Sequence, residues 1–354
     1  MTGHPMADFN SALVTGATGF IGRRLVDRLV QMGVQTRCML RPESDAATLP
    51  REHGSIHRGR LDDHAELSAA MDGMDVVFHL AGVTKSLRRQ TLWDVNETIT
   101  ECVAAVCADQ PSPPTLVLVS SLAAAGPNPM DTRLGRARVR CEDDIEQPVS
   151  DYGRSKLAGE VAARRYADRV PISIVRPPIV LGPADRDGLE LVKPIAKMGI
   201  HPVPGWQAGL FSVVHVDDLV NGLVAVASRG RRCRYHAPTL SPTSEGIYFA
   251  ADPQVVDYAE LGRMVGRCVH GSRQVRCLRL PPAVVRVAAA ANQLAGRMTG
   301  RPHIFGWDKS REALASGWAC SVEKIQSECR VRFTKDLQTR LNETVSWYRN
   351  AGWI

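Results

Sequence analysis

The sequence has few aromatic residues, no closely paired cysteines and no long apolar run. Phe, Trp and Tyr make up 5% of its 354 residues. No apolar stretch reaches the roughly 18 to 20 residues that a membrane-spanning helix needs. The nine cysteines are scattered without a Cys-x-x-Cys pair, so we expect neither a disulfide framework nor a structural metal site. The start, MTGHPMADFN, shows no charged segment followed by an apolar one, so we expect no export signal and a cytoplasmic protein.

The remaining composition is that of a globular protein with a mild basic excess. Hydrophobic residues make up 44% and charged residues 23% of the chain, and the length suggests about two structural units. The 44 Lys and Arg exceed the 37 Asp and Glu, which gives a net charge of +7. This excess favours anionic partners in general, and nothing else in the sequence points to nucleic acid.

Apolar strands alternate with helical patterns through the first half of the chain. Strands are predicted at 12–16, 36–40, 56–59, 75–80, 115–120 and 172–176. Helices are predicted between them, including 65–71, 93–109 and 151–167. This alternation predicts an α/β fold with a doubly wound parallel sheet. We expect a dinucleotide-binding domain over 10–176 with a segment near 212–250 returning to it, and a smaller, mostly helical substrate-binding lobe over 177–354.

A glycine-rich turn follows the first predicted strand. It reads TGATGFIG, with Gly16, Gly19 and Gly22 three residues apart. Such glycines allow a tight turn, a close approach of pyrophosphate to the backbone, and close packing of the following helix. The N-terminus of that helix presents free N–H groups to the phosphates. A strand before the turn and a helix after it favour a dinucleotide site over a plain turn, and we expect Thr18, Phe20 and Ile21 to contribute to it.

The end of the second predicted strand bears on which dinucleotide binds. An acidic side chain there hydrogen-bonds a ribose 2′-hydroxyl, whereas an arginine pairs with a 2′-phosphate. The sequence has Arg37 and Arg41 at this point, and no acid until Glu43. We therefore expect NADP, with NAD as the alternative if both arginines are simply solvated.

Three further residues suggest proton chemistry. Tyr152 and Lys156 lie four apart on a predicted helix and so share a face. A neighbouring ammonium stabilises a phenolate and lowers the tyrosine pKa from near 10 toward neutral pH. Ser121 follows the strand at 115–120, where a hydroxyl can hydrogen-bond a carbonyl oxygen that is becoming an alkoxide.

These motifs resemble those of the extended short-chain dehydrogenase/reductase, or NAD-dependent epimerase/dehydratase, family. The similar segments are TGATGFIG, HLAG at 79–82, SSLAAAG, YGRSK, RPPIVLGP at 176–183 and VHVDDL at 214–219. The resemblance implies a Rossmann domain with a C-terminal substrate lobe and a catalytic set of Ser121, Tyr152 and Lys156. Tyr152 is then the general acid/base, Lys156 lowers its pKa and holds the nicotinamide ribose, and Ser121 orients the substrate oxygen.

The resemblance also implies further residues around the cofactor. Those expected to line it are Leu61, Leu80, Ala81 and Gly82. Asn96 is expected to support the site, while His215 and Asp217 are expected to be structural. The family commonly has an acid where this chain has Arg60, so a carboxylate contact to the adenine is replaced here by a cation that can assist with a 2′-phosphate.

At a few positions the sequence differs from particular members of the family, and these differences reduce the number of reactions that it is expected to catalyse. A sugar-nucleotide dehydratase carries an Asp-Glu pair after the strand-end Ser or Thr, and Leu122 and Ala123 supply neither. The epimerases have an arginine that clamps the substrate diphosphate, and Phe211 stands where we align it. An apolar ring cannot replace a bidentate cation, so an uncharged, hydrophobic substrate is favoured.

The segment 281–298 is apolar and helical in pattern, with Arg286 and Arg297 as its charges. It resembles the helical insert of the 3β-hydroxysteroid dehydrogenase and dihydroflavonol reductase-like branch. It can be a core helix of the lobe, or a lid or membrane-surface contact aided by basic clusters near 133–140 and 273–279. A peripheral position at the inner face of the membrane therefore stays open, as does a homodimer.

Together these features predict an NADP-preferring oxidoreductase that interconverts a ketone and a secondary alcohol. The expected substrate is sterol-like or a long-chain 3-oxo lipid such as a keto-sphingolipid. The alternative is a nucleotide-sugar 4-epimerase with retained NAD. A non-catalytic sensor protein is disfavoured because the Ser, Tyr and Lys set is intact.

Overall fold

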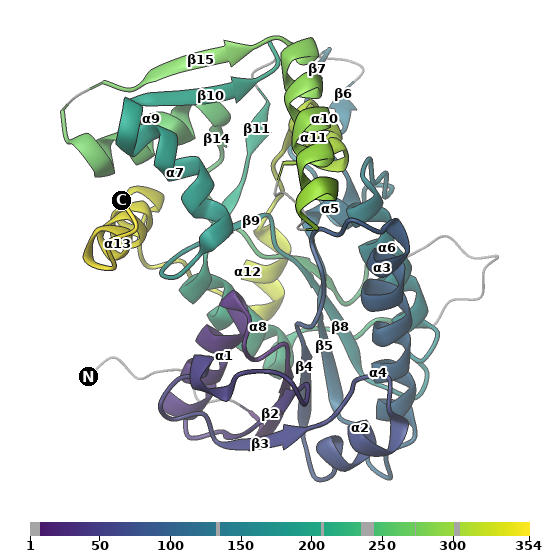
Figure 1. Cartoon of the computed structure of the whole chain (residues 1–354). Coiled ribbons are helices and arrows are strands. Elements are labelled where there is room, and N and C mark those ends of the chain that lie inside the picture. The colour runs from purple at the N-terminus through teal and green to yellow at the C-terminus, as the bar shows by residue number, and fades with distance from the viewer. Residues whose placement is uncertain (1–7, 132–134, 207–208, 235–243, 273, 301–304) are drawn as a thin grey trace.

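The computed structural model describes residues 8–131, 135–206, 209–234, 244–272, 274–300 and 305–354. It confirms the predicted α/β fold, with a seven-stranded sheet in the order β13-β8-β5-β4-β1-β2-β3 and every neighbouring pair parallel (Figure 1). Its strands are β1 (Ser11–Thr15), β2 (Gln35–Leu40), β3 (Ser55–Arg58), β4 (Val76–His79), β5 (Thr115–Val119), β8 (Ile172–Arg176) and β13 (Ile247–Phe249). The edge strand β13 comes from the segment that was expected to return to the sheet.

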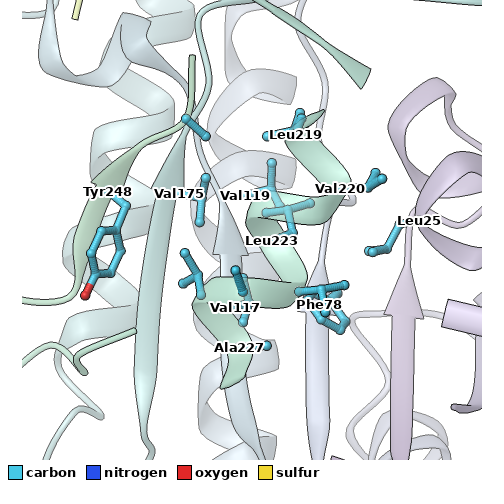
Figure 2. Packing of buried hydrophobic residues seen from close by; sticks show 14 of the residues in the cluster. Leu25, Phe78, Val117, Val119, Val175, Leu219, Val220, Leu223, Ala227 and Tyr248 are labelled. Carbon is cyan, nitrogen blue, oxygen red and sulfur yellow. The ribbon is translucent and has the colours of Figure 1, made fainter. Parts of the chain in front are cut away.

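Helices cover both faces of the sheet because β1, β4, β5, β8 and β13 are buried along nearly their whole length and so on both sides. The helices on one face are α1 (Phe20–Gln31), α8 (Val216–Arg229) and α12 (Glu323–Cys329). Those on the other face are α2 (His64–Met71), α4 (Ile99–Ala108) and α6 (Asp151–Arg164). Figure 2 shows the first of these layers, in which α8 packs on β4, β5 and β8 beside Leu25 of α1 and Tyr248 of β13.

The second lobe stands at the carboxyl end of the sheet (Figure 1). A third apolar core holds together α7 (Arg186–Met198), α9 (Tyr258–His270) and α13 (Leu337–Asn350). The small strands of the lobe are β10 (Ile200–Pro204), β11 (Leu210–Phe211), β14 (Val256–Asp257), β15 (Arg276–Leu280) and β16 (Gly317–Trp318). Two more helices, α10 (Pro282–Thr299) and α11 (Trp307–Ala313), pack on each other.

Short elements connect these layers. They are α3 (Arg89–Trp93), α5 (Leu122–Ala125), β6 (Met130–Asp131), β7 (Arg136–Ala137), β9 (Ile179–Leu181), β12 (Val213–His215) and a 3₁₀ turn at Ala46–Thr48. The single helix predicted over 93–109 is instead α3, a π-helical segment at Asp94–Thr98 and α4. No helix within the described ranges is both long and apolar enough to cross a bilayer.

Ion pairs fasten the start of α8 to α1 on one side and to the lobe on the other. The His215 Nδ1 accepts a hydrogen bond from the Asp217 N–H at the start of α8, and Asp217 pairs with Arg24 of α1. Asp218 pairs with Arg340 of α13, whose Nε lies 2.7 Å from Asp218 Oδ2. His215 and Asp217 thus occupy structural positions. The ligand atoms of His215, Asp217 and Glu343 lie within 4.8 Å of one another, but arginines already pair with both carboxylates.

The basic cluster predicted near 133–140 does not form one exposed patch. Arg140 is buried and donates to the carbonyls of Pro127 and Ile145, while Arg138 pairs with Asp144. Arg133, like Arg273 of the other cluster, lies outside the described residues. Arg140 and Arg138 therefore hold the loop before α6 in place.

Replacing Arg340 by Ala tests the junction between α8 and α13. The buried carboxylate of Asp218 then loses its partner, which costs about 3 kcal/mol of unfolding free energy. Denaturant titration measures this loss. The control is Arg332→Ala at an exposed position, where we expect a change below about 0.5 kcal/mol. Equal stability of the two variants would show that the junction contributes little.

Candidate active site

The glycine-rich turn between β1 and α1 has the shape that a pyrophosphate needs. Gly16 has a φ of +69°, and a Cβ there would lie 2.7 Å from the backbone nitrogen of Ala81. A Cβ on Gly22 would overlap the Gly16 carbonyl oxygen, so the helix packs directly on the turn. Gly19 precedes α1, and no side chain of the described residues caps that helix. Its first N–H groups are therefore available to an anion.

The other expected cofactor residues follow neighbouring strands at the same edge of the sheet. Leu80, Ala81 and Gly82 come after β4, beside the glycine turn. The Ala81 N–H lies 3.4 Å from Thr15 Oγ1, at the end of β1. Leu61 follows β3 and packs partly buried on the sheet core. The site thus combines a turn that has room only for glycine, a helix N-terminus and the carboxyl ends of parallel strands. This combination is typical of a dinucleotide site.

The cations near β2 have separate environments. Arg41, just past the end of β2, is exposed, and its Nε lies 3.5 Å from Glu43 Oε1. Arg60 forms a two-point pair with Asp62 at 2.9 and 2.7 Å. Arg37 points elsewhere, because its guanidinium donates to the carbonyls of Ala69, Ala70 and Asp72 at the end of α2. The expectation that Arg37 binds a cofactor phosphate is therefore wrong, since it stabilises a helix C-terminus.

Helix α6 carries Tyr152 and Lys156, and two glycines bring it unusually close to its neighbours. A Cβ on Gly153 would overlap the Ala123 carbonyl oxygen of α5, and one on Gly159 would overlap the Asn96 carbonyl oxygen. Asn96 belongs to the π-helical segment, a feature that often occurs at functional sites. Close contact on two sides fixes the axis of α6.

Asn96 connects α6 to the loop after β4. Its side-chain nitrogen donates to the Val83 carbonyl at 2.9 Å and to Ser155 Oγ at 3.0 Å, while its oxygen accepts from the Val83 N–H. A Cβ on the neighbouring Gly82 would lie 3.6 Å from the Lys156 nitrogen. Asn96 thus holds the cofactor-side loop against the helix that carries Tyr152 and Lys156, as the family resemblance implied.

Ser121 and Tyr152 are brought together at the end of β5. Both side chains line the same cavity, and Ser121 accepts a hydrogen bond from the Ala123 N–H as the cap of α5. Burial is the main cause that raises the pKa of Tyr152 above 10, and the charge of Glu312 adds to it. The neighbouring Ser121 hydroxyl and Lys309 ammonium act in the opposite direction and lower the pKa. Tyr152 therefore holds its proton at neutral pH.

Lys156 is buried beside the same strand end. Its ammonium donates to the Val119 carbonyl at 2.8 Å. Burial lowers its pKa from 10.5 to about 8, against the opposing charge of Glu160. The expectation that Lys156 lowers the Tyr152 pKa is not met in this structure, because burial raises that pKa and, among the described residues, the ammonium that opposes the rise is that of Lys309. Lys156 lies instead next to Gly82.

A buried ionic network lies behind α6, and sequence reasoning did not identify it. Arg176 at the end of β8 is fully buried and pairs with Glu160 and Glu146. Ser120 donates to the same Glu160 carboxylate. The available signal was an arginine at the last position of a mainly apolar strand, together with a Glu four residues after Lys156.

Helix α11 brings a second set of unpredicted residues to the site. The Asp308 carboxylate accepts from the Asp151 and Tyr152 N–H groups at 2.7 and 3.1 Å, which caps α6 from the lobe. Glu312 accepts from Ser150 Oγ at 2.6 Å and pairs with Lys309. These contacts join positions more than 150 residues apart in the chain.

A cavity of about 360 Å³ lies between the strand-end residues and the lobe. Its floor contains Ser121, Leu122 and Tyr152. Its walls are mainly apolar and aromatic: Ala123, Pro178, Ile179, Val203, Pro204, Phe211, Tyr258, Ala259, Phe305, Ala313, Ala315 and Trp318. The rings of Phe211 and Tyr258 lie 5.1 Å apart.

The charged residues of this cavity balance one another. Among the described residues of the wall, three cations (Lys85, Arg279 and Lys309) face three carboxylates (Asp187, Asp257 and Glu312). Lys85 pairs with Asp187 at 3.1 Å, Lys309 pairs with Glu312, and Arg279 donates to the Trp206 carbonyl. The cavity therefore suits a mainly apolar molecule with a polar group near Tyr152.

Comparisons with known proteins agree with this geometry. The model of the NAD dependent epimerase/dehydratase family matches residues 12–235. A ceramide reductase of Caulobacter vibrioides is 30% identical over 341 residues, which cover 96% of this chain and 95% of the relative. A 4-hydroxy-2-methyl-3-oxo-4-farnesyl-3,4-dihydroquinoline-1-oxide ketoreductase of Stigmatella aurantiaca is 25% identical over 88% of this chain and 93% of its own.

Solved structures confirm the fold. The UDP-glucuronic acid 4-epimerase of Bacillus cereus in complex with NAD matches with a TM-score of 0.70 at 18% identity. The match covers 96% of this chain and 99% of that one. At this identity the likeness shows the fold alone.

Lys156→Met tests the burial of the ammonium in the protein without cofactor. Below pH 8 the folded chain carries a buried charge that the unfolded chain, with a lysine pKa of 10.5, holds in water. We expect the variant to be more stable than the wild type at pH 7, by on the order of 2 kcal/mol. The advantage shrinks as the pH rises from about 8 toward 10.5, because the wild-type amine becomes neutral.

Chemical unfolding of both proteins across this pH range measures the effect. Lys197→Met at an exposed position of α7 is the matched control, with no expected pH-dependent difference. A wild type that is more stable than the Lys156→Met variant at pH 7 would contradict the expectation.

Proposed function

The chain belongs to the NAD dependent epimerase/dehydratase family, and we propose that within it the protein is an NADP-preferring ketoreductase. Family and relatives make it an NAD(P)-dependent oxidoreductase. The proposed reaction interconverts a ketone and a secondary alcohol on a hydrophobic substrate. That substrate is sterol-like or a long-chain 3-oxo lipid such as a keto-sphingolipid.

The apolar cavity above Tyr152 is the observation that carries this proposal. A substrate with a diphosphate would place two or more negative charges among Asp187, Asp257 and Glu312, and Lys85 and Lys309 already pair with the first and the last of these. Phe211 presents a ring where a clamping arginine would be needed. An aliphatic chain or a ring system, by contrast, buries its surface against Phe211, Tyr258 and Trp318.

The names of the relatives support the same substrate class. One is a ceramide reductase that aligns over nearly the whole chain, and another is a ketoreductase of a farnesylated ring compound. Both names describe reduction of a molecule with a long apolar part. At 30% and 25% identity they support the class of reaction rather than a particular substrate.

The residues around the cavity divide the chemistry as follows. When bound, the reduced nicotinamide supplies a hydride to the carbonyl carbon. Tyr152 donates its proton to the carbonyl oxygen, and burial, which raises its pKa, keeps that proton available at neutral pH. Ser121 hydrogen-bonds the same oxygen as negative charge develops on it. Lys156, beside Gly82, holds the nicotinamide ribose.

We assign cofactor binding to the glycine-rich turn between β1 and α1 and to the residues next to it. The first N–H groups of α1, including those of Phe20 and Ile21, hold the pyrophosphate. Arg41 pairs with the 2′-phosphate, because its guanidinium is exposed and only weakly engaged by Glu43. Arg60 assists once it leaves Asp62.

A nucleotide-sugar 4-epimerase with retained NAD is the second candidate. The fold it shares with the UDP-glucuronic acid 4-epimerase is the observation in its favour. Such an enzyme returns its hydride to the substrate and consumes no added cofactor. Epimerisation of UDP-glucuronic acid by the purified protein, without NADPH oxidation on any 3-oxo lipid, would replace the proposed function by this one.

Tyr152→Phe tests the assigned acid. The variant keeps the ring and its packing but has no proton to donate, so we expect kcat with a long-chain 3-oxo lipid to fall at least about 100-fold. KM and cofactor binding change little. Tyr166→Phe, at a partly buried tyrosine after α6, is the control. NADPH oxidation followed by absorbance measures both, and undiminished turnover by Tyr152→Phe would remove Tyr152 from the mechanism.

Arg41→Ala tests the cofactor preference. Loss of a cation that pairs with a phosphate weakens NADPH binding by about tenfold, whereas NADH binding is nearly unchanged. Fluorescence titration of both nucleotides gives the two dissociation constants, and exposed Arg51→Ala is the control. A wild type that binds NADH more tightly than NADPH would overturn the preference.

A further inference from the structure

Helix α10 exposes a continuous apolar stripe. Val284, Val287, Leu294 and Met298 recur at the spacing that places residues on one face of a helix. Apolar residues on one face usually pack against a core, but these four are 48%, 69%, 61% and 82% exposed. Ala288, Ala291 and Ala295 fall on the same face and are exposed as well. These seven residues are called the α10 stripe. The opposite face, with Val285 and Ala289, is buried in the lobe. Helix α10 is therefore held in the lobe by that face, and the α10 stripe takes no part in the core.

The chain around α10 is basic and free of acids. Residues 261–307 contain eight arginines and neither Asp nor Glu, and two of the eight, Arg263 and Arg267, pair with Glu260 just before this range. Within the part of the chain that the structure describes, Arg276, Arg286 and Arg297 are exposed and form no ion pair. The α10 stripe can insert into an apolar layer, while the unpaired arginines beside it contact negative charges at the boundary of that layer.

The α10 stripe also lies next to the substrate cavity. Arg279, three residues before α10, and Phe305, shortly after it, both line the cavity. The Asn292 side chain of α10 donates to the Phe305 carbonyl at 3.0 Å, and Gln293 accepts from the Trp307 N–H at the start of α11. Figure 1 shows α10 at the outside of the lobe, beside α11. A surface that covers the stripe therefore comes close to the cavity wall.

We propose that α10 docks this protein on the surface of an anionic phospholipid bilayer, with the α10 stripe inserted between the head groups. A second copy of the chain fits this face less well. A symmetric contact through α10 brings the same arginines of both copies together with no acid in 261–307 to pair with them. Docking stands independently of the proposed ketone reduction. The corollary that the cavity takes its substrate from the bilayer rests on that proposed function.

The test is cosedimentation of the full chain with vesicles. One set is phosphatidylcholine alone, and the other contains about 30% phosphatidylglycerol. We expect binding to the anionic vesicles that weakens as salt is added. Val287→Glu/Leu294→Glu places two carboxylates on the stripe, and we expect its partition coefficient to fall at least about tenfold. Arg286→Gln/Arg297→Gln is expected to weaken binding to the anionic vesicles only.

The matched control is Ile145→Glu/Val161→Glu, which adds the same two charges at exposed apolar residues outside the lobe and is expected to bind as the wild type does. Unchanged NADPH binding and unfolding midpoints show that each variant is folded. A wild type that stays in the supernatant, or a stripe variant that binds equally well, overturns the proposal. The proposal is also overturned if sedimentation velocity shows a dimer of the wild type and a monomer of the stripe variant, since the α10 stripe then binds a second copy of the chain. Vesicle binding without ketone reduction would instead reject the proposed function and leave docking intact.

Discussion

The close approach of α6 to its neighbours is the constraint on which the site depends. Two positions on this helix, Gly153 and Gly159, have no space for a Cβ because backbone carbonyls of α5 and the π-helical segment occupy it. The π-helical segment places the Asn96 carbonyl against Gly159 and directs the Asn96 side chain toward Val83. Helix α6 can therefore neither rotate nor slide, and the hydroxyl of Tyr152 and the ammonium of Lys156 face the end of β5.

The lobe completes this arrangement rather than merely covering it. Asp308 supplies acceptors to the first N–H groups of α6, so the helix that carries Tyr152 is capped by the part of the chain that also forms the cavity wall. Lys309 and Glu312 add opposite influences on the Tyr152 pKa. The environment of the tyrosine is thus set jointly by burial between two layers and by charges that come from α11.

Sequence reasoning predicted what depends on local pattern. The strand and helix alternation, the turn with Gly16 and the pair Tyr152 and Lys156 follow from periodicity and from short motifs. It missed Asp308 and Glu312 because their partners lie more than 150 residues away, and no spacing rule joins them. It misassigned Arg37 because a cation near a strand end can serve either a ligand or a neighbouring helix, and only the position of α2 decides between them.

The place of β13 at the edge of the main sheet affects how the chain folds as it is synthesised. Strand β8 ends at Arg176, but its outer neighbour, β13, begins only at Ile247. A nascent chain that has left the ribosome as far as β8 has formed most of the sheet, yet it presents an apolar strand with unpaired backbone groups along one side. That edge stays open to pairing with other chains until roughly another 70 residues have emerged. The order of the strands along the chain therefore leaves the β8 edge as the last part of the main sheet to be covered during synthesis.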